Sequence, residues 1–236
     1  MALEFDQFDT RKYPMLPARD GYREWESTYE QTVLDEMDLD LLARVTTVPW
    51  SEVRRAIDLG CGTGRTGTWL KQAGVAEIDG VDITPEMIEH ARTKGAHRTL
   101  TVGDVSDTGV PDASYDLAIA SLVDEHLADI APLYREASRV IDIGGHFVIV
   151  GFHPHFIMAT GMPTHFHRES GEPVAIETHV HLFSDHFKAA SSAGLALIEM
   201  DERVIDDRWI VKKPHWEKYR GRVISFAFVW RRMVVA

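Results

Sequence analysis

The chain has 236 residues, of which 44% are hydrophobic and 26% are charged, and its formal net charge is −12. This composition is typical of one globular domain with a substantial core. No apolar run reaches the length of about eighteen residues that a membrane helix needs, and the first residues lack the basic and apolar regions of a signal peptide. We therefore expect a cytoplasmic protein without a membrane partner.

Nucleic acid is not expected as a partner, because lysine and arginine contacts to phosphates supply most of the affinity in such complexes and this chain is acidic. We interpret three basic pairs as solvated strand ends: Arg54-Arg55, Lys212-Lys213 and Arg231-Arg232. The expected partner is a small-molecule substrate. The sequence leaves the oligomeric state open, and a homodimer is compatible with it.

Residues 1–50 are expected to form an N-terminal arm and a lid helix. Residues 1–20 contain Pro14 and Pro17 and show no sustained period, which favours an arm. From Tyr22 to Arg44, apolar residues recur at three-to-four spacing, which predicts one amphipathic helix. This helix either packs on the sheet or also closes over a ligand.

The segment from Ile57 to Thr66 is the most informative part of the chain. An apolar strand, Arg55 to Leu59, ends in three alternating glycines and passes into a helix-compatible stretch from Thr66 to Ala73. Such glycines allow positive φ and close approach of a ligand, and Asp58 places a carboxylate at the same turn. The pattern predicts a cofactor-binding loop. The single cysteine, Cys61, excludes an intrachain disulfide and fills a small-residue position of this loop.

The loop alone is ambiguous, because Gly62-Thr-Gly-Arg-Thr-Gly67 also fits the pattern of dinucleotide-binding enzymes. The next predicted strand, Glu77 to Ile83, carries Asp82 near its end, where a carboxylate accepts hydrogen bonds from a ribose diol. A third predicted strand, His97 to Val102, is followed by Gly103-Asp104. This second carboxylate lies at the same sheet edge, where it can accept from an adenine amine, and it disfavours a nicotinamide cofactor.

Helix signals follow the second of these strands. Thr84 is a suitable N-cap, Pro85 suits the first helical position and Gly95 is a helix stop. The expected buried stripe comprises Met87, Ile88 and Ala91. Ile83 and Met87 flank the cap, so they are predicted either to contact an adenine or to pack in the core.

Five motifs, including those described above, lie in order between about Arg54 and Phe152. They are Asp58-Leu-Gly-Cys-Gly-Thr-Gly64, Gly80-Val-Asp-Ile-Thr-Pro-Glu-Met87, Gly103-Asp104, Tyr115 to Leu127, and a helix followed by a strand over Leu133–Val150. In this order and spacing the chain resembles a class I S-adenosylmethionine-dependent methyltransferase of the small, single-domain type 11 kind. The resemblance implies an α/β fold, with a Rossmann-like doubly wound sheet of seven strands, mostly parallel with an antiparallel last strand.

The resemblance also implies that S-adenosyl-L-methionine is the cofactor and S-adenosyl-L-homocysteine the product. It places Trp25 and Tyr29 at the methionine end of the cofactor. The residues expected to bind the cofactor are Trp25, Tyr29, Asp58, Gly60, Cys61, Gly62, Gly64, Arg65, Asp82, Ile83, Met87, Gly103, Asp104, Val105, Ser121 and Leu122. We expect a single domain over residues 1–236, with a cofactor-binding half over residues 51–152.

Residues 153–183 interrupt the doubly wound pattern and are predicted to be a substrate-lid insertion. Residues 184–236 are predicted to form a helix from Ser184 and two strands, Leu195–Val204 and Val223–Val234. The insertion contains three His-x-His pairs, which raise the alternative of a metal site. We predict no metal, because no cysteine supports one. We predict instead a general base, with His153 as the first candidate and His126 as the second.

Three functions remain after the sequence is read. The leading one is methyl transfer to a small acceptor through an oxygen, nitrogen or carbon nucleophile. A nicotinamide-dependent oxidoreductase is a second, although it leaves Asp104 and the antiparallel strand unexplained. A non-catalytic S-adenosylmethionine-binding partner protein is the third. The acceptor and the methylated atom are left open by the sequence.

Overall fold

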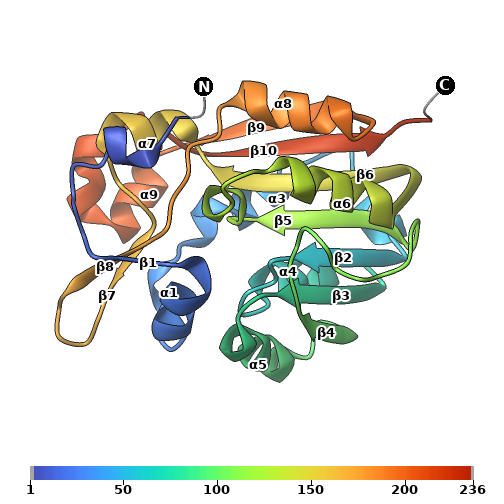
Figure 1. Cartoon of the computed structure of the whole chain (residues 1–236), viewed down its shortest axis with the longest axis horizontal. Helices are drawn as coiled ribbons and strands as arrows, with labels where there is room; N and C mark the ends of the chain where they lie inside the picture. Colours follow the sequence, from blue (N-terminus) through green and yellow to red (C-terminus); the bar gives the residue numbers. More distant parts are fainter. Residues whose placement is uncertain (1–2, 235–236) are drawn as a thin grey trace.

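A seven-stranded sheet forms the centre of the molecule in a computed structural model that describes residues 3–234 (Figure 1). Its strands are β2 (Arg55–Leu59), β3 (Glu77–Asp82), β4 (Thr99–Val102), β5 (Tyr115–Ser121), β6 (Ile141–Phe152), β9 (Leu195–Val204) and β10 (Val223–Arg232). Their order is β4-β3-β2-β5-β6-β10-β9, and β10 runs antiparallel to both of its neighbours. The predicted mostly parallel sheet with an antiparallel last strand is confirmed.

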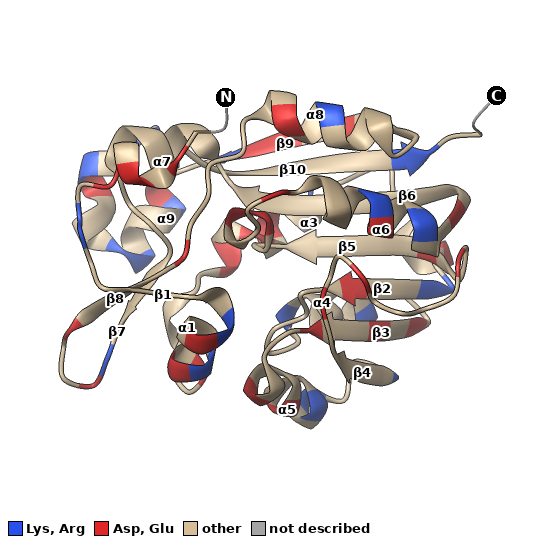
Figure 2. Ribbon diagram, viewed as in Figure 1, with Lys and Arg blue, Asp and Glu red and all other residues tan. Residues whose placement is uncertain are grey.

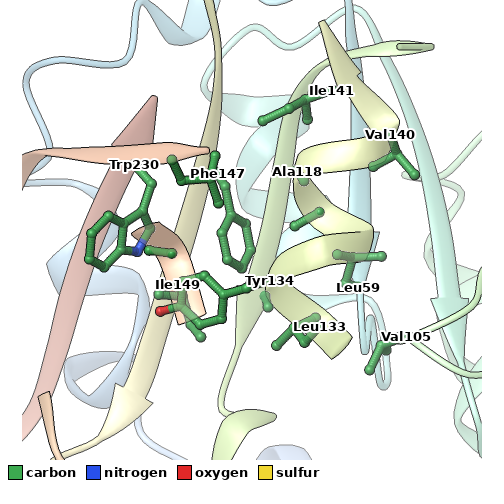
Figure 3. Packing of buried hydrophobic residues seen from close by; sticks show 14 of the residues in the cluster. Leu59, Val105, Ala118, Leu133, Tyr134, Val140, Ile141, Phe147, Ile149 and Trp230 are labelled. Carbon is green, nitrogen blue, oxygen red and sulfur yellow. The ribbon is translucent and has the colours of Figure 1, made fainter. Parts of the chain in front are cut away.

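Helices cover both faces of this sheet, which makes the fold doubly wound. They include α3 (Leu39–Leu42), α4 (Arg65–Gln72), α5 (Pro85–Lys94), α6 (Ala131–Val140) and α8 (Phe183–Ser192). Strand residues alternate between the faces: Ala118 of β5 packs with α6 and α8, whereas Leu117 packs with α3 and α4. Figure 3 shows the first of these cores, in which Tyr134 of α6 lies edge-on to Phe147 and Trp230.

The helix predicted after the second strand is confirmed in detail. Thr84 occupies the N-cap position, Pro85 opens α5, and Gly95 ends it with a φ of +60°. The helix predicted from Ser184 begins at Phe183, with Leu182 as its N-cap.

The prediction of one long helix from Tyr22 to Arg44, before the sheet, is wrong. The chain forms separate short elements instead: α1 (Ala18–Trp25), α2 (Tyr29–Thr32), the 3-10 turn η2 (Asp35–Met37) and α3. The apolar residues serve two different cores, since Trp25 packs with Phe166 while Leu41 packs under the large sheet. A straight helix cannot reach both, and the buried carboxylate of Asp38 caps the new start at Leu39.

A second, three-stranded sheet lies at the carboxyl ends of the parallel strands, where the arrowhead of β5 points in Figure 1. It is built from β1 (Met15–Leu16), β7 (His165–His167) and β8 (Pro173–Ile176). We call this sheet, with α1, α7 (Pro154–Thr160), α9 (Asp207–Lys212) and the 3-10 turn η5 (Pro214–Tyr219), the lid. Three further 3-10 turns are η1 (Phe5–Gln7), η3 (Trp50–Glu52) and η4 (Asp124–His126).

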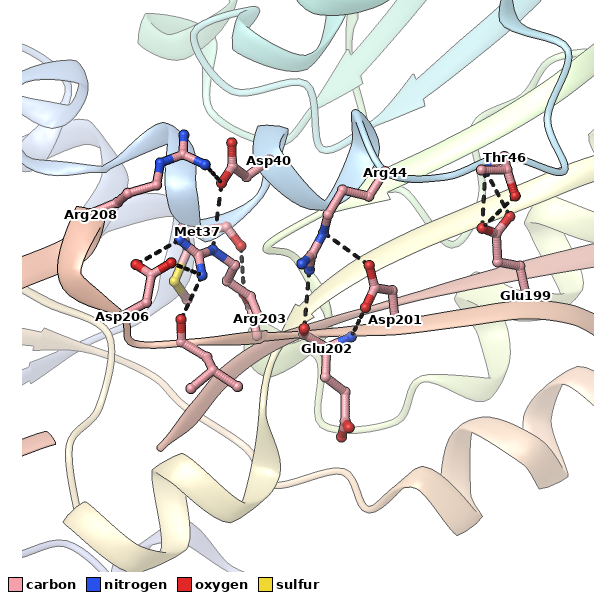
Figure 4. A network of polar contacts seen from close by, with 12 residues as sticks. Met37, Asp40, Arg44, Thr46, Glu199, Asp201, Glu202, Arg203, Asp206 and Arg208 are labelled. Atoms are coloured by element: carbon pink, nitrogen blue, oxygen red, sulfur yellow. Dashed lines mark hydrogen bonds and ion pairs between the residues drawn. The ribbon is translucent and has the colours of Figure 1, made fainter. Parts of the chain in front are cut away.

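Ion pairs fasten the N-terminal segment to β9 and α9 (Figure 4). Asp40 lies 3.6 Å from Arg203 and 3.4 Å from Arg208, and Arg44 lies 2.9 Å from Asp201. Arg203 is buried and also pairs with Asp206, whose side chain caps α9. These contacts fix α9 against the sheet. The pair Lys212-Lys213 therefore ends a helix, and its prediction as a strand end is wrong.

Candidate active site

An inner cavity lies at the carboxyl ends of β2, β3 and β5, the edge where ligands bind in open α/β sheets. Its lining residues are Ala18, Tyr22, Tyr29, Gly60, Gly62, Asp82, Ile83, Thr84, Met87, Asp104, Val105, Ser121, Leu122, Val123, His126 and Leu127. Most of the residues predicted from the motifs are among them. Sequence reasoning missed Tyr22, which it treated as the start of the helix predicted from Tyr22 to Arg44.

The glycine loop and Asp82 form one wall of the inner cavity. Gly62 has a φ of +50°, and a Cβ added there would meet no atom within 4 Å, so its backbone faces open space. The Asp82 carboxylate accepts from the N–H of Gly62 and from that of Thr84, each at 2.8 Å. Burial raises the pKa of Asp82. The same carboxylate therefore orders the loop and faces the cavity.

A second wall is largely apolar and carries the other predicted carboxylate. Asp104 lies at the end of β4, next to the end of β3, and its side chain accepts from the N–H of Ser106 at 2.7 Å. Ile83 is 46% exposed although it is a large apolar residue, and it lies on this wall with Val105. Leu122 completes the lining with a φ of +57°, a strained conformation that occurs often at functional sites.

Asp58 does not line the inner cavity. Its carboxylate points beneath the glycine loop, where Oδ2 lies 3.1 Å from His97 Nε2 and both side chains are fully buried. The His97 ring occupies the space left by small residues, since a Cβ added at Gly67 would lie 2.3 Å from it and one at Gly80 2.9 Å. Gly67, in the first turn of α4, is thus required for close packing against His97, a residue the sequence did not single out.

Five more predicted cofactor residues lie outside the lining of the inner cavity: Trp25, Cys61, Gly64, Arg65 and Gly103. Arg65 stands behind the wall, where it pairs with Asp38 at 2.9 Å, and Asp38 in turn accepts from the Ser121 hydroxyl at 3.3 Å. Burial and the neighbouring acids Asp58 and Asp82 raise the pKa of Cys61, so its thiol is not an activated nucleophile.

A larger lid cavity, of about 730 Å³, adjoins the inner one. The two share Tyr22, Tyr29 and Leu122. The remaining lining residues of the lid cavity are Trp25, Thr28, Gln31, Thr32, Val33, Leu34, Met37, Glu125, Phe152, Met162, Pro163, Thr164, His165, Phe166, His167, Trp209, Lys212, Lys213, His215 and Trp216. Trp25 is therefore a wall of the second cavity, where its ring stacks on Phe166 at 5.5 Å between centroids.

His126 and Tyr22 form a dyad where the cavities meet. The Tyr22 hydroxyl lies 2.8 Å from His126 Nε2, and His126 Nδ1 lies 2.7 Å from the carbonyl oxygen of Glu177. Since a carbonyl only accepts, Nδ1 carries a proton and the neutral ring accepts the Tyr22 proton at Nε2. Burial raises the pKa of Tyr22 well above its usual value. Of the two histidines predicted as bases, His126 is the one that lines the inner cavity.

His153 lies outside both cavities. Its Nδ1 accepts from the N–H of His155 at the start of α7, and its Nε2 lies 2.9 Å from Glu202. The ring also packs edge-on to Phe183. These contacts favour a structural role, and burial lowers the pKa of His153.

The other histidines of residues 153–183 are spread over the lid. His165 and His167 line the lid cavity. His181 instead forms a hydrogen bond of 2.7 Å between its Nε2 and the carbonyl oxygen of Leu127. Over residues 3–234, no group of three or more His, Cys, Asp or Glu side chains is arranged to hold a metal ion. Within the same residues, no helix is long and apolar enough to cross a membrane.

Comparison with known proteins identifies the family of this site. Residues 57–149 match the family model described as a methyltransferase domain. A demethylmenaquinone methyltransferase of Deinococcus radiodurans is 34% identical over 106 residues, which cover 43% of this chain and 44% of that protein. Residues 57–149 of the chain therefore carry a methyltransferase domain.

A second curated relative matches a similar share of the chain. Ajmaline N-methyltransferase of Rauvolfia serpentina is 31% identical over 108 residues, 43% of this chain and 37% of that protein. The chain thus spans less than half the length of these two curated relatives.

Solved structures share the fold over most of the chain. An S-adenosylmethionine-dependent methyltransferase of Mesorhizobium loti has a TM-score of 0.65 at 24% identity and covers 84% of this chain and 98% of its own. DhpI in complex with S-adenosylhomocysteine has a TM-score of 0.66 at 17% identity and covers 93% of this chain and 97% of its own. The methyltransferase-domain match over residues 57–149 and the antiparallel β10 argue against the nicotinamide-dependent alternative.

Proposed function

We propose that this methyltransferase transfers the methyl group of S-adenosylmethionine to an oxygen, nitrogen or carbon atom of a small molecule bound in the lid cavity. One observation carries the proposal: the inner cavity and the lid cavity meet at Tyr22, Tyr29 and Leu122. A donor in the first therefore faces an acceptor in the second.

The inner cavity has the groups that this cofactor needs. Asp82 would accept from the ribose hydroxyls and Asp104 from the adenine amine, while the Gly62 backbone leaves room for the ligand. When bound, S-adenosylmethionine supplies a methyl carbon that is activated by the positive sulfur. The protein contributes mainly by fixing donor and acceptor in reactive geometry, which is worth up to about 7–11 kcal/mol in favourable models.

The Tyr22–His126 dyad would remove a proton from the acceptor where the chemistry requires it. Tyr22 remains protonated near neutral pH because its pKa is raised, so it can accept the substrate proton only as it passes its own to His126 Nε2. Buried Glu125 lies 3.8 Å from the same nitrogen and would stabilise the imidazolium that results. The dyad thus assigns His126 as the base and Tyr22 as the group next to the substrate.

Calorimetry with S-adenosylmethionine, S-adenosylhomocysteine and NAD tests the cofactor first. Release of S-adenosylhomocysteine in a metabolite screen then tests turnover. Tyr22→Phe should leave cofactor affinity unchanged and lower turnover by about 10²–10⁴-fold for an acceptor that must lose a proton. Tyr115→Phe is the matched control, because it removes a buried hydroxyl that bonds Asp79 away from both cavities.

Binding of S-adenosylmethionine without methylation of any metabolite would favour the non-catalytic partner protein instead. Failure to bind S-adenosylmethionine or S-adenosylhomocysteine at all would refute the proposed function. Equal losses of turnover in Tyr22→Phe and Tyr115→Phe would remove the dyad from the mechanism.

A further inference from the structure

Lys213 brings an uncompensated positive charge to the lid cavity. Its Nζ donates to the carbonyl oxygen of Thr32 at 2.9 Å and lies 5.5 Å from the centre of the Trp216 ring. Over the described residues 3–234 no carboxylate lies within ion-pair distance of it. Burial lowers the pKa of Lys213, with no acid opposing the shift. Its neighbour Lys212 differs, because it pairs with the buried carboxylate of Glu36 at 2.6 Å.

Arg11 adds a second positive charge that, like Lys213, acts on His165 of the cavity wall. Its Nη2 donates to the Tyr219 hydroxyl at 3.2 Å, and its Nε is buried without a hydrogen-bond partner among the residues described. Both Arg11 and Lys213 act on His165, whose pKa is lowered by burial first and then by His167 and these two cations. Two cations thus act on His165, a residue of the cavity wall, in a chain whose net charge is −12. Figure 2 shows the basic positions along α9.

The lid cavity is also lined by an acidic residue, Glu125, next to His126 of the inner cavity. Glu125 is only 3% exposed and has one carboxylate oxygen without a hydrogen-bond partner in the described structure. Aromatic rings form further parts of the wall, among them Trp25 stacked on Phe166. The cavity volume of about 730 Å³ lies in the range of small-molecule sites, about 300–1,000 Å³. The cavity therefore combines aromatic walls with a basic and an acidic group.

We propose that the lid cavity binds a flat, mostly apolar molecule that carries one anionic group, and that Lys213 holds this anion. A cation in a water-poor site attracts an anion more strongly than it does in water. Glu125 lies 3.8 Å from His126 and repels the anion from the part of the cavity next to the inner cavity, so the ligand enters in one orientation. This inference rests on the proposed function and adds the substrate class to it. In that orientation the nucleophile of the ligand points at the Tyr22–His126 dyad.

Two fluorescent probes with the same ring system test the proposal. 8-Anilino-1-naphthalenesulfonate carries a sulfonate, and N-phenyl-1-naphthylamine lacks it. Each is titrated into the full chain saturated with S-adenosylhomocysteine. We expect Lys213→Met to weaken binding of the sulfonate probe by about tenfold or more and to leave the neutral probe within about twofold, since hydrogen bonds to charged groups change affinity by about ten- to hundredfold.

Two further variants control this result. Lys218→Met removes an exposed lysine of η5 that lies over the Tyr219 ring but does not line the cavity, and it should bind both probes as the wild type does. Lys213→Arg should retain the affinity for the sulfonate probe. Added salt should weaken the sulfonate probe alone.

Equal affinity of Lys213→Met and wild type for the sulfonate probe would overturn the proposal, as would an equal loss of both probes. Binding of S-adenosylhomocysteine is measured separately by calorimetry in every variant. If the protein does not bind it, the proposed function fails, while the probe titrations repeated without it still decide whether the lid cavity selects an anion.

Discussion

Truncation of Asp82 tests the centre of the cofactor site. Asp82 is 9% exposed and lines the inner cavity, and its carboxylate accepts from the N–H groups of Gly62 and Thr84. Asp82→Ala removes the proposed acceptor of the ribose hydroxyls. It also frees the Gly62 N–H, so the loop loses a contact that orders it.

The expected loss of affinity follows from this geometry. A hydrogen bond to a charged group contributes about 1.5–3 kcal/mol. Each oxygen of Asp82 already accepts one backbone N–H at 2.8 Å, so we use the lower limit of this range for the ribose pair. Asp82→Ala should therefore weaken binding of S-adenosylhomocysteine by more than about 1.5 kcal/mol, which is more than about tenfold in Kd.

Isothermal calorimetry measures this loss directly, and Asp79→Ala is its matched control. Asp79 lies on the same strand and is 8% exposed, but its carboxylate bonds Arg98 and the Tyr115 hydroxyl outside the cavity. Asp79→Ala should lower stability and leave the affinity unchanged. Unchanged affinity in Asp82→Ala would remove Asp82 from the site. Equal losses in both variants would show that the effect is one of folding.

Three further predictions concern the glycines and a buried histidine. Gly62→Val should abolish binding of S-adenosylhomocysteine in calorimetry while the protein stays folded; Gly171→Val, also at positive φ in open space but outside the cavities, should bind normally. Gly67→Ala should lower the free energy of unfolding by about 1–3 kcal/mol in urea, because its Cβ would lie 2.3 Å from His97, and an unchanged midpoint would contradict this. Burial lowers the pKa of the His186 imidazole to about 3. Below about pH 6.5 the imidazole therefore gains a proton in the unfolded chain but not in the folded one. The free energy of unfolding then falls by about 1.4 kcal/mol for each pH unit of acidification. His186→Gln should reduce the pH slope of urea stability by that amount between about pH 6.5 and pH 4.5; equal slopes would refute the burial argument.

The cofactor half could be predicted because its signals are local in sequence. Strand, glycine turn and helix follow one another from β2 to α4, and Asp82 and Asp104 end the next two strands. The direction of the Asp58 side chain could not be predicted in this way. It depends on His97, which is 39 residues away and enters the space above Gly67 only in the folded chain.

The sequence predicted a break of the doubly wound pattern over residues 153–183 but not the structure of this segment. Its small sheet pairs Met15 of the N-terminal arm with Ala175, so neither segment alone shows the period of a stable strand. The end of α1 at Trp25 also depends on tertiary contacts, because the following residues must turn from the lid to the large sheet. Tertiary contacts outweigh the helical period in such a segment.

The two lysines of Lys212-Lys213 show why the acceptor is harder to infer than the cofactor. In sequence they are an ordinary basic pair, and helix geometry gives them different neighbours. Lys212 is neutralised by Glu36, whereas Lys213 faces Thr32 and Trp216 with its charge uncompensated within the described residues. The cofactor loop lies within one short stretch of chain, but this charge pattern requires segments from the arm, the lid and α9 to meet. On the proposed function, substitutions at the lid cavity should therefore change the acceptor while the motifs of the cofactor site stay the same.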